Sequence, residues 1–330
     1  MFYKRLSLAT LTLVLTGCLS TPPEKGAHTQ RLVTAYDYQI VNAEHEPISL
    51  AALTEATADA DVVFIGEYHR NQASHLLEMQ LFASRHQSNR QRPTILSLEM
   101  FTREQQAILD RYLNSEIGEK YLMEEAPAWG NYQSSYRPLV EYAKQHQLVV
   151  VAANASGDIV RCIGRKGEDY LNVLSAEEQK HIAQYPFAEI PGYQEKFFGL
   201  MGGAKHMPDN RARNSYLAQV ARDNTMAESI AAALKKNPGS QVIHLNGSFH
   251  SEDQLGTVAA LKRLNPELKI QVVTPVHLNE FEQGDFEGRD DFYYLLNPQP
   301  KEFVDPEYMK ASRKAMFEKS RQKANMCKPI

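Results

Sequence analysis

The chain is poor in cysteine, in tryptophan and in net charge. Three cysteines and one tryptophan occur among 330 residues, and the sequence contains no CxxC or CxxCH motif. Without these motifs, a thioredoxin-type redox site and a covalently attached c-type haem are both excluded. A formal net charge of −4 gives no sign of the basic surface that nucleic acid requires, so we expect no nucleic-acid partner.

Long apolar runs are also missing beyond the N-terminal segment. None there approaches the roughly 20 apolar residues that a membrane-spanning helix needs. The hydrophobic content of 43% and the charged content of 23% are ordinary for a globular protein. A chain of this length can bury a large core, either as one α/β domain or as a domain with an insertion.

The N-terminal segment has the features of a lipoprotein signal peptide. Lys4 and Arg5 precede a mostly apolar run over residues 6–15, and the segment ends in the sequence LTGC, whose cysteine is Cys18. Small residues before a cysteine suit a lipoprotein signal peptidase, and the thiol is the group that is lipidated. The apolar run is only about half of a membrane span. We therefore predict a signal peptide over residues 1–17 and a lipid on Cys18.

The residues after Cys18 predict where the protein is held. Leu19, rather than an acidic residue, follows the cysteine, and by the bacterial sorting rule this favours the cell outer membrane, on its periplasmic or surface face. Residues 18–33 are polar and contain Pro and Gly, which predicts a flexible tether. We expect an α/β domain over residues 34–300 and a helical tail over residues 301–330.

Short apolar runs separated by helical patterns predict the fold. Runs of this kind are typical of buried parallel strands, and alternation with helices is typical of a sheet covered on both faces. The sequence thus predicts an open, mainly parallel α/β sheet. Its expected strands are 62–65, 95–98, 148–151, 242–245 and 270–273, with further strands at 36–41 and 292–296.

A long insertion separates the third and fourth of these strands, and it exceeds what one crossover needs. We expect a helix over 158–184, then a segment over 185–207 that is rich in Pro, Gly, aromatic residues and Met, and a long helix over 209–236. Residues 158–210 are the predicted lid over the sheet. For Cys162 and Cys327, two readings remain: a disulfide, or one buried thiol and one free thiol.

Polar residues follow directly after four of the predicted strands. They are Glu67, His69, Glu99, Asn154 and His250. Because the carboxyl ends of parallel strands share one edge where such folds bind ligands, we expect these side chains to converge. Two of the turns have the form Gly-x-x-His, in which glycine allows a tight turn. The alternative is that the histidines only cap helices or bind backbone groups.

The long predicted helix adds polar groups to the same place. Gln219 and Asp223 are four residues apart and share a stripe with apolar residues, and Arg222 lies beside them. Polar groups on a core-facing stripe are costly unless they have partners. Either these residues stabilise the helix through capping or ion pairs, or the helix forms one wall of the polar pocket.

The predicted lid offers an apolar surface. Its sequence combines aromatic and methionine residues over 190–203 with Tyr193 and His206 near its ends. Such a surface suits a flat apolar ligand, and Tyr or His could reach a metal at the centre of that ligand. The alternative is a hydrophobic hairpin that packs onto the domain.

These motifs together resemble the ChaN-like haem-binding lipoproteins, within the wider group of Tiki, TraB and erythromycin-esterase-like proteins. The resemblance spans about residues 36–275 and rests on the order of the motifs and on the lipobox. The matching motifs are Gly66-Glu67-x-His69, Ala73-x-His75, Leu98-Glu99-Met100-Phe101, Gln219-x-x-Arg222-Asp223-x-x-Met226-Ala227 and Asn246-Gly247-x-x-His250.

The resemblance implies an α/β fold with a helical lid and a role in iron or haem uptake. Haem would be bound non-covalently, in some members between two subunits, and passed to a receptor or uptake system. A lid tyrosine is the implied ligand: Tyr193 is our first choice, Tyr216 and Tyr132 follow, and His206 is the assisting histidine.

Tiki-like relatives support a second hypothesis, a divalent-metal-dependent hydrolase. In it, Glu67, His69 and His250 hold the ion, because mixed carboxylate and imidazole ligands suit such ions. Glu67 or Glu99 would be the general base for a bound water. In a third reading the polar cluster is only a buried network and the protein a scaffold.

Overall fold

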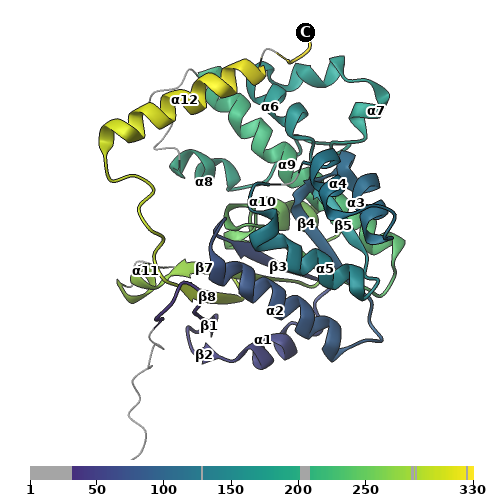
Figure 1. Ribbon diagram of the computed structural model, residues 1–330, viewed down its shortest axis with the longest axis vertical. Coiled ribbons are helices and arrows are strands. Elements are labelled where there is room, and N and C mark those ends of the chain that lie inside the picture. The colour runs from purple at the N-terminus through teal and green to yellow at the C-terminus, as the bar shows by residue number, and fades with distance from the viewer. Residues whose placement is uncertain (1–31, 128, 201–208, 284–285, 287, 325) are drawn as a thin grey trace, which may run out of the picture.

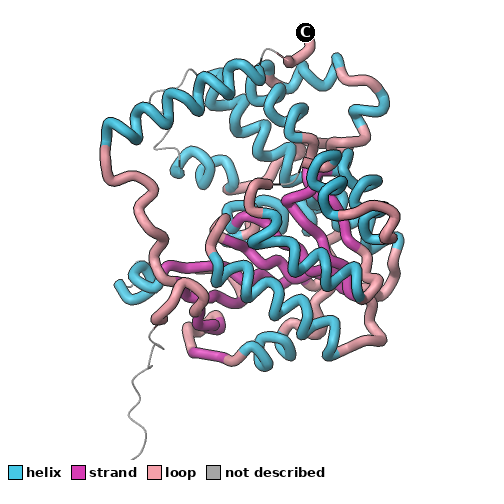
Figure 2. Tube along the Cα trace, viewed as in Figure 1, coloured by secondary structure: helices cyan, strands magenta, loops and turns pink. Residues whose placement is uncertain are grey.

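An eight-stranded sheet forms the centre of the protein (Figures 1 and 2). The structure is a computed structural model that describes residues 32–127, 129–200, 209–283, 286, 288–324 and 326–330. The strands follow the order β2-β1-β8-β7-β3-β6-β4-β5. Their bounds are β1 Tyr38–Asn42, β2 Pro47–Ile48, β3 Val62–Glu67, β4 Thr94–Thr102, β5 Val150–Asn154, β6 Gln241–Gly247, β7 Ile270–His277 and β8 Phe292–Leu296.

Six strands, from β8 to β5 in the sheet order, run parallel, and β1 pairs antiparallel with both β8 and β2. The predicted α/β class with a mainly parallel sheet is therefore confirmed. The third predicted strand was placed two residues early: β5 begins at Val150 and continues through Ala152 and Ala153 to Asn154. The small alanines of β5 gave too weak an apolar signal to place its end.

Helices cover both faces of the sheet, as Figure 1 shows. The face toward α2 and α5 buries β-strand residues such as Val63 and Leu98, and the face toward α9 and α10 buries residues such as Phe64 and Val242. The helix bounds are α1 Leu50–Ala56, α2 Gln72–Ser88, α3 Gln106–Leu113, α4 Glu119–Glu125, α5 Arg137–Gln145, α6 Gly157–Lys166, α7 Ala176–Gln179, α8 Tyr193–Leu200, α9 Asp209–Lys236, α10 Gly256–Leu264, α11 Leu278–Gln283 and α12 Pro306–Ala324.

Short helical turns complete the connections. They are the 3-10 turns η1 Arg103–Gln105, η3 Glu168–Val173, η5 Ser248–His250 and η6 Glu252–Gln254, and the π-helical turn η2 Tyr132–Tyr136. Two of them, η2 and η5, lead directly to the polar residues at the strand ends.

The segment between β5 and α9 differs from its prediction. One helix was expected over 158–184, but α6 ends at Lys166 because Gly167 adopts φ +86°, which turns the chain out of the helix. The 3-10 turn η3 follows, and a new helix, α7, begins after the capping residue Ser175. The long helix predicted over 209–236 is confirmed as α9.

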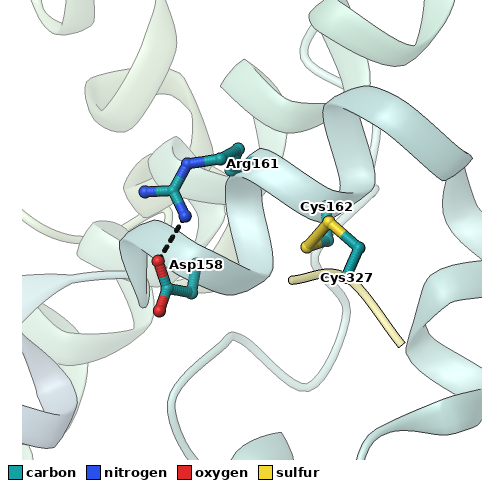
Figure 3. Close-up of a disulfide and its surroundings, with 4 residues drawn as sticks. All are labelled: Asp158, Arg161, Cys162 and Cys327. Carbon is teal, nitrogen blue, oxygen red and sulfur yellow. Dashed lines mark hydrogen bonds and ion pairs between the residues drawn. A yellow bond between two sulfur atoms is a disulfide. The ribbon is translucent and has the colours of Figure 1, made fainter. Parts of the chain in front are cut away.

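A disulfide attaches the C-terminal end of the chain to this region. Cys162 on α6 is bonded to Cys327, with their Cα atoms 5.6 Å apart (Figure 3). This resolves the open choice for the two cysteines. The preceding helix, α12, is largely exposed and lies across the top of the view in Figure 1. Within the described part of the chain, no helix combines the length and apolar character needed to cross a membrane.

Several sequence predictions fall outside the described residues. They are the signal peptide, Cys18 with most of the tether, and His206. At the last tether residues, Leu32 is buried and its carbonyl accepts a hydrogen bond from Asn297 Nδ2 at 3.2 Å.

Candidate functional site

The carboxyl ends of β3, β4, β5 and β6 carry Glu67, Glu99, Asn154 and Gly247. Strands β3 and β6 are in register so that Glu67 lies beside Gly247, and the Gly247 amide donates to Glu99 Oε2 at 2.7 Å. The Asn154 side chain donates to the Glu99 carbonyl at 3.0 Å. Neighbouring strand ends thus hold one another through polar contacts, and we call this group and the residues bound to it the strand-end site.

Glu67 lies on the α2 and α5 side of the strand-end site. Its Oε1 accepts hydrogen bonds from His69 Nδ1 and from the Tyr136 hydroxyl, both at 2.5 Å. Its Oε2 faces His75 Nδ1 at 3.4 Å. Burial works to raise the pKa of Glu67, but the hydrogen bond from His69 and the electrostatic effect of the nearby histidines outweigh it and lower that pKa.

His75 and Glu78 extend this side toward the interior. Both project from α2, and His75 Nδ1 lies 2.8 Å from Glu78 Oε2. Among the described residues, Glu67, His75 and Glu78 form a buried group whose potential ligand atoms all lie within 4.8 Å of one another. Burial beside Glu67 raises the pKa of Glu78 well above its ordinary value, and burial lowers the pKa of His75.

Our sequence reasoning missed Glu78 and Tyr136, and it used His75 only as part of the family motif. A usable signal existed on α2: His75 and Glu78 are three residues apart, on the same side as the buried Leu81 and Phe82. Helix residues with this spacing lie on the same face. Polar side chains on the face that carries Leu81 and Phe82 are therefore expected to point toward the sheet.

His250 lies on the α9 and α10 side. Its Nδ1 is 2.7 Å from Asp223 Oδ1, and its Nε2 is 3.6 Å from Glu99 Oε1. The Thr257 hydroxyl also donates to Asp223 Oδ1, at 2.8 Å. Burial works to lower the pKa of His250, but the charges of Asp223 and Glu99 outweigh it and raise that pKa. This side therefore favours a protonated His250 between two carboxylates.

Two glycines allow these close approaches. A Cβ on Gly247 would lie 2.8 Å from His69 Nε2 and 3.7 Å from Glu99 Oε2. Gly256 has φ +56°, and a Cβ there would lie 2.4 Å from the His250 carbonyl oxygen. His69 itself is half-exposed, with 48% of its side chain accessible, and its ring meets Trp129 edge-on, with ring centroids 4.8 Å apart.

The helix α9 contributes the remaining polar residues. Arg222 donates to Asn154 Oδ1 at 3.2 Å, and Asp223 binds His250. Gln219 Nε2 donates to the Tyr193 hydroxyl at 3.2 Å and contacts the His250 ring. All eight residues predicted for the polar pocket are therefore at this end of the sheet or in contact with it.

The trio predicted to bind metal is divided between the two sides of the site. His69 is held by Glu67, whereas His250 is held by Asp223 and faces Glu99. The group within mutual reach keeps Glu67 but has His75 and Glu78 in place of the two predicted histidines. The reason is strand geometry, because Glu67 and Glu99 point to opposite faces of the sheet.

The three candidate haem tyrosines occupy different environments. Tyr132 is fully buried against Phe101 in the core on the α2 side. Tyr193 is also fully buried, and burial beside Asp223 raises its pKa well above the ordinary value. Tyr216 on α9 is partly exposed. Of the three, only Tyr216 presents its ring at the surface, whereas Tyr193 would have to move to reach a ligand outside.

Tyr216 belongs to a cluster that we call the aromatic patch, made of Phe197, Phe198, Tyr216 and Phe249. All four rings are partly exposed. The Tyr216 ring centroid lies 5.7 Å from Phe197 and 6.0 Å from Phe198, and Phe197 lies 6.4 Å from Phe249. Burial of its ring, with Glu189 nearby, raises the pKa of Tyr216.

The aromatic patch fits a flat apolar cofactor such as haem. Four adjacent rings offer dispersion contacts, and one carries a phenol of the kind that ligates haem iron. A cavity of about 1020 Å³ lies elsewhere, along the exposed edge of β5 between Arg103 and Lys236. It contains none of the strand-end or patch residues, so we do not assign the ligand to it.

The fold and the strand-end residues define the class: an α/β protein with paired Glu and His groups at the carboxyl ends of parallel strands. A family model described as "Haem-binding uptake, Tiki superfamily, ChaN" matches residues 53–261. The chain belongs to this family.

One solved structure shares this fold, and two others are reported beside it with lower similarity. ChaN of Campylobacter jejuni, titled for cofacial haem binding, has a TM-score of 0.60 at 16% identity and covers 79% of this chain and 98% of its own. An erythromycin esterase in an open conformation has a TM-score of 0.44 at 13% identity, over 73% of this chain and 77% of its own. A Bacillus cereus protein has a TM-score of 0.37 at 13% identity, over 70% of each chain. No curated protein matches the chain.

Proposed function

We propose that this protein binds haem non-covalently on the aromatic patch and serves haem or iron acquisition. The observation that carries the proposal is the group of four adjacent, partly exposed rings that includes a tyrosine. Membership of a family described by haem-binding uptake supports it. The bound haem supplies the iron, and the chain supplies the surface that holds it.

Each patch residue has a distinct part in this binding. Phe197, Phe198 and Phe249 cover a face of the porphyrin, which removes apolar area from water at about 25 cal/mol per Å². Tyr216 offers its phenol oxygen to the iron. Lys196 steadies the patch, because its Nζ is bonded to the Phe249 carbonyl at 3.3 Å and lies 4.9 Å from the Phe249 ring.

The proposal places the protein at the cell outer membrane, anchored by a lipid on Cys18. A tethered domain keeps captured haem beside the membrane and able to meet a receptor or uptake system. Two chains facing each other across haem would cover the exposed side of the patch.

Membrane attachment is checked by fractionation of wild type and Cys18→Ser. Dimer formation is checked by size exclusion with and without haemin.

Haemin titration tests the ligand. We expect the full chain to give a Soret band that saturates, and Tyr216→Phe to shift or lose it with at least about a tenfold weaker affinity, equivalent to about 1.4 kcal/mol. Tyr121→Phe is the matched control, since Tyr121 is 42% exposed on α4 and lies outside the patch. An unchanged band in Tyr216→Phe would refute this ligand assignment.

A hydrolase remains the second candidate, because one histidine is both accessible and oriented. His69 is half-exposed, and Glu67 holds its Nδ1. This arrangement leaves Nε2, which lies beside Gly247, as the nitrogen that acts as a general base. If the site is catalytic, His69→Ala abolishes hydrolysis of ester substrates. His86 is a partly buried histidine on α2, and the control variant His86→Ala should keep the activity. No activity in wild type with or without divalent ions would reject it.

A further inference from the structure

Glu67, His75 and Glu78 form a compact cluster that neither haem binding nor hydrolysis uses as a unit. Their side chains are 1%, 4% and 0% exposed. The ligand atoms lie within 4.8 Å of one another. Unlike most exposed acidic groups, these are enclosed on the α2 side of the sheet, where a charge without a counter-charge is costly.

The cluster leaves polar atoms without partners. Glu67 Oε2, Glu78 Oε1 and His75 Nε2 are buried and have no hydrogen-bond partner among the described residues. The Glu67 and Glu78 carboxyl groups are also close enough to influence each other directly. Two carboxylates sharing a buried space need a positive charge between them, either a shared proton or a cation.

The surroundings orient Glu67 for a second partner. Its Oε1 is already occupied by His69 and Tyr136, which turns Oε2 inward toward His75. Outer groups that fix a carboxylate in this way are typical of metal sites.

The distances match a small ion with nitrogen and oxygen ligands. His75 Nδ1 is 2.8 Å from Glu78 Oε2 and 3.4 Å from Glu67 Oε2. Two ligand atoms bound tetrahedrally at about 2.0–2.1 Å lie about 3.3 Å apart, which falls between the two values. Calcium takes about six to eight oxygen ligands, and this cluster offers too few.

We propose that Glu67, His75 and Glu78 bind one divalent transition-metal ion, of the class of Zn²⁺. Its charge of +2 neutralises the two carboxylates, and the imidazole supplies the nitrogen ligand that such ions favour. The site is separate from the aromatic patch, so it does not depend on haem binding.

The test is metal analysis of the full chain in detergent, stripped with a chelator, loaded with Zn²⁺ and desalted. We expect one equivalent of Zn²⁺ in wild type, and at least about a 100-fold weaker affinity in Glu78→Gln and His75→Gln, because each removes a ligand. Tyr136→Phe, which frees Glu67 Oε1, is expected to weaken binding by about 10-fold.

Controls separate this site from surface binding. His86 and His146 are side by side, with ring centroids 5.0 Å apart, and such a pair can bind Zn²⁺ on its own. His86→Ala removes this pair, and it should keep the one equivalent because we expect the buried cluster to hold that ion. If the ion is lost in His86→Ala, or if Glu78→Gln keeps it, the proposal is wrong.

A second measurement does not depend on variants. Zn²⁺ should raise the Tm of stripped wild type, because an ion that binds only the folded state stabilises it. No shift at saturating Zn²⁺ would overturn the proposal. Glu78→Gln resembles a protonated Glu78, so it should fold and bind haemin normally. Loss of Zn²⁺ with normal haemin binding distinguishes this site from the haem proposal.

Discussion

The strand-end site and the aromatic patch are built in opposite ways. In the strand-end site, Glu67, Glu99 and Asp223 are buried. The carboxylates of Glu67 and Asp223 each have two hydrogen-bond partners, and that of Glu99 accepts a hydrogen bond from the Gly247 amide. The patch instead consists of partly exposed rings on α8, α9 and η5 with few polar constraints. A network of fixed charges suits ion binding or proton transfer, whereas adaptable apolar area suits a large flat ligand.

The two regions nevertheless meet at η5, where Phe249 precedes His250, and at Tyr193. Tyr193 lies beneath the patch, with its ring centroid 5.4 Å from Phe249, and its hydroxyl accepts a hydrogen bond from Gln219. Gln219 also contacts His250. Tyr193 therefore connects the two regions. Substitutions in one region test whether the other region changes with it.

Gly256→Ala should have the largest effect, and on the strand-end site. Positive φ and a Cβ 2.4 Å from the His250 carbonyl together predict a loss of about 2–5 kcal/mol in the free energy of unfolding. Urea denaturation measures it. Gly157→Ala is the control, because its Cβ meets nothing within 4 Å, and we expect no loss there. Equal stability of the two variants would contradict this account of His250.

Loss of the disulfide should come next. Cys162→Ser with Cys327→Ser removes a crosslink between positions separated by 165 residues, and we expect about 2–4 kcal/mol of destabilisation. Thermal unfolding of wild type with and without reductant should reproduce the difference. Because neither cysteine is among the groups that set the pKa of His250, that pKa should stay unchanged; a changed pKa would show that the tail constrains the site.

Asp223→Asn should lower the pKa of His250, since it removes one of the two charges that raise it. In wild type the raised pKa contributes stability that is fully present below about pH 6.5 and is lost as pH rises through the folded-state pKa. The variant should lose this pH dependence and about 1–3 kcal/mol at low pH. NMR titration of His250 measures the pKa, and a value unaltered by the substitution would exclude Asp223 as the cause.

Tyr193→Phe should have the smallest effect. It removes one hydrogen bond, to Gln219, worth about 0.5–1.5 kcal/mol. We expect the haemin affinity to stay within about twofold of wild type, which is under 0.5 kcal/mol. A loss of the Soret band here would restore Tyr193 as the ligand in preference to Tyr216.

The sheet was largely predictable, because buried parallel strands are apolar along their whole length. Phe64 and Val242 belong to such runs, and both are fully buried. The convergence of Glu67 and Glu99 followed from the same pattern, since each comes at the carboxyl end of a strand. Strand periodicity could not predict toward which helices each carboxylate would point. It therefore could not predict which side chains each carboxylate would contact.

Helical contributions to the site were harder to predict. Glu78 and Tyr136 reach Glu67 through tertiary packing of α2 and η2. The spacing on α2 could show that Glu78 faces the sheet, but not that it would meet Glu67. The break at Gly167 was visible as a glycine, but its φ of +86° depends on the chain packing around it. Our proposal of Tyr216 over Tyr132 and Tyr193 rests on exposure, which is a property of the folded surface.

Haemin titration of Tyr216→Phe beside Glu99→Gln tests the central claim most directly. Tyr216 lies on α9 and belongs to the patch, whereas Glu99 lies on β4 and belongs to the strand-end site. Our account predicts a shifted or lost Soret band in Tyr216→Phe and a wild-type titration in Glu99→Gln. Normal binding by Tyr216→Phe with loss in Glu99→Gln would place the haem at the strand ends and contradict the account.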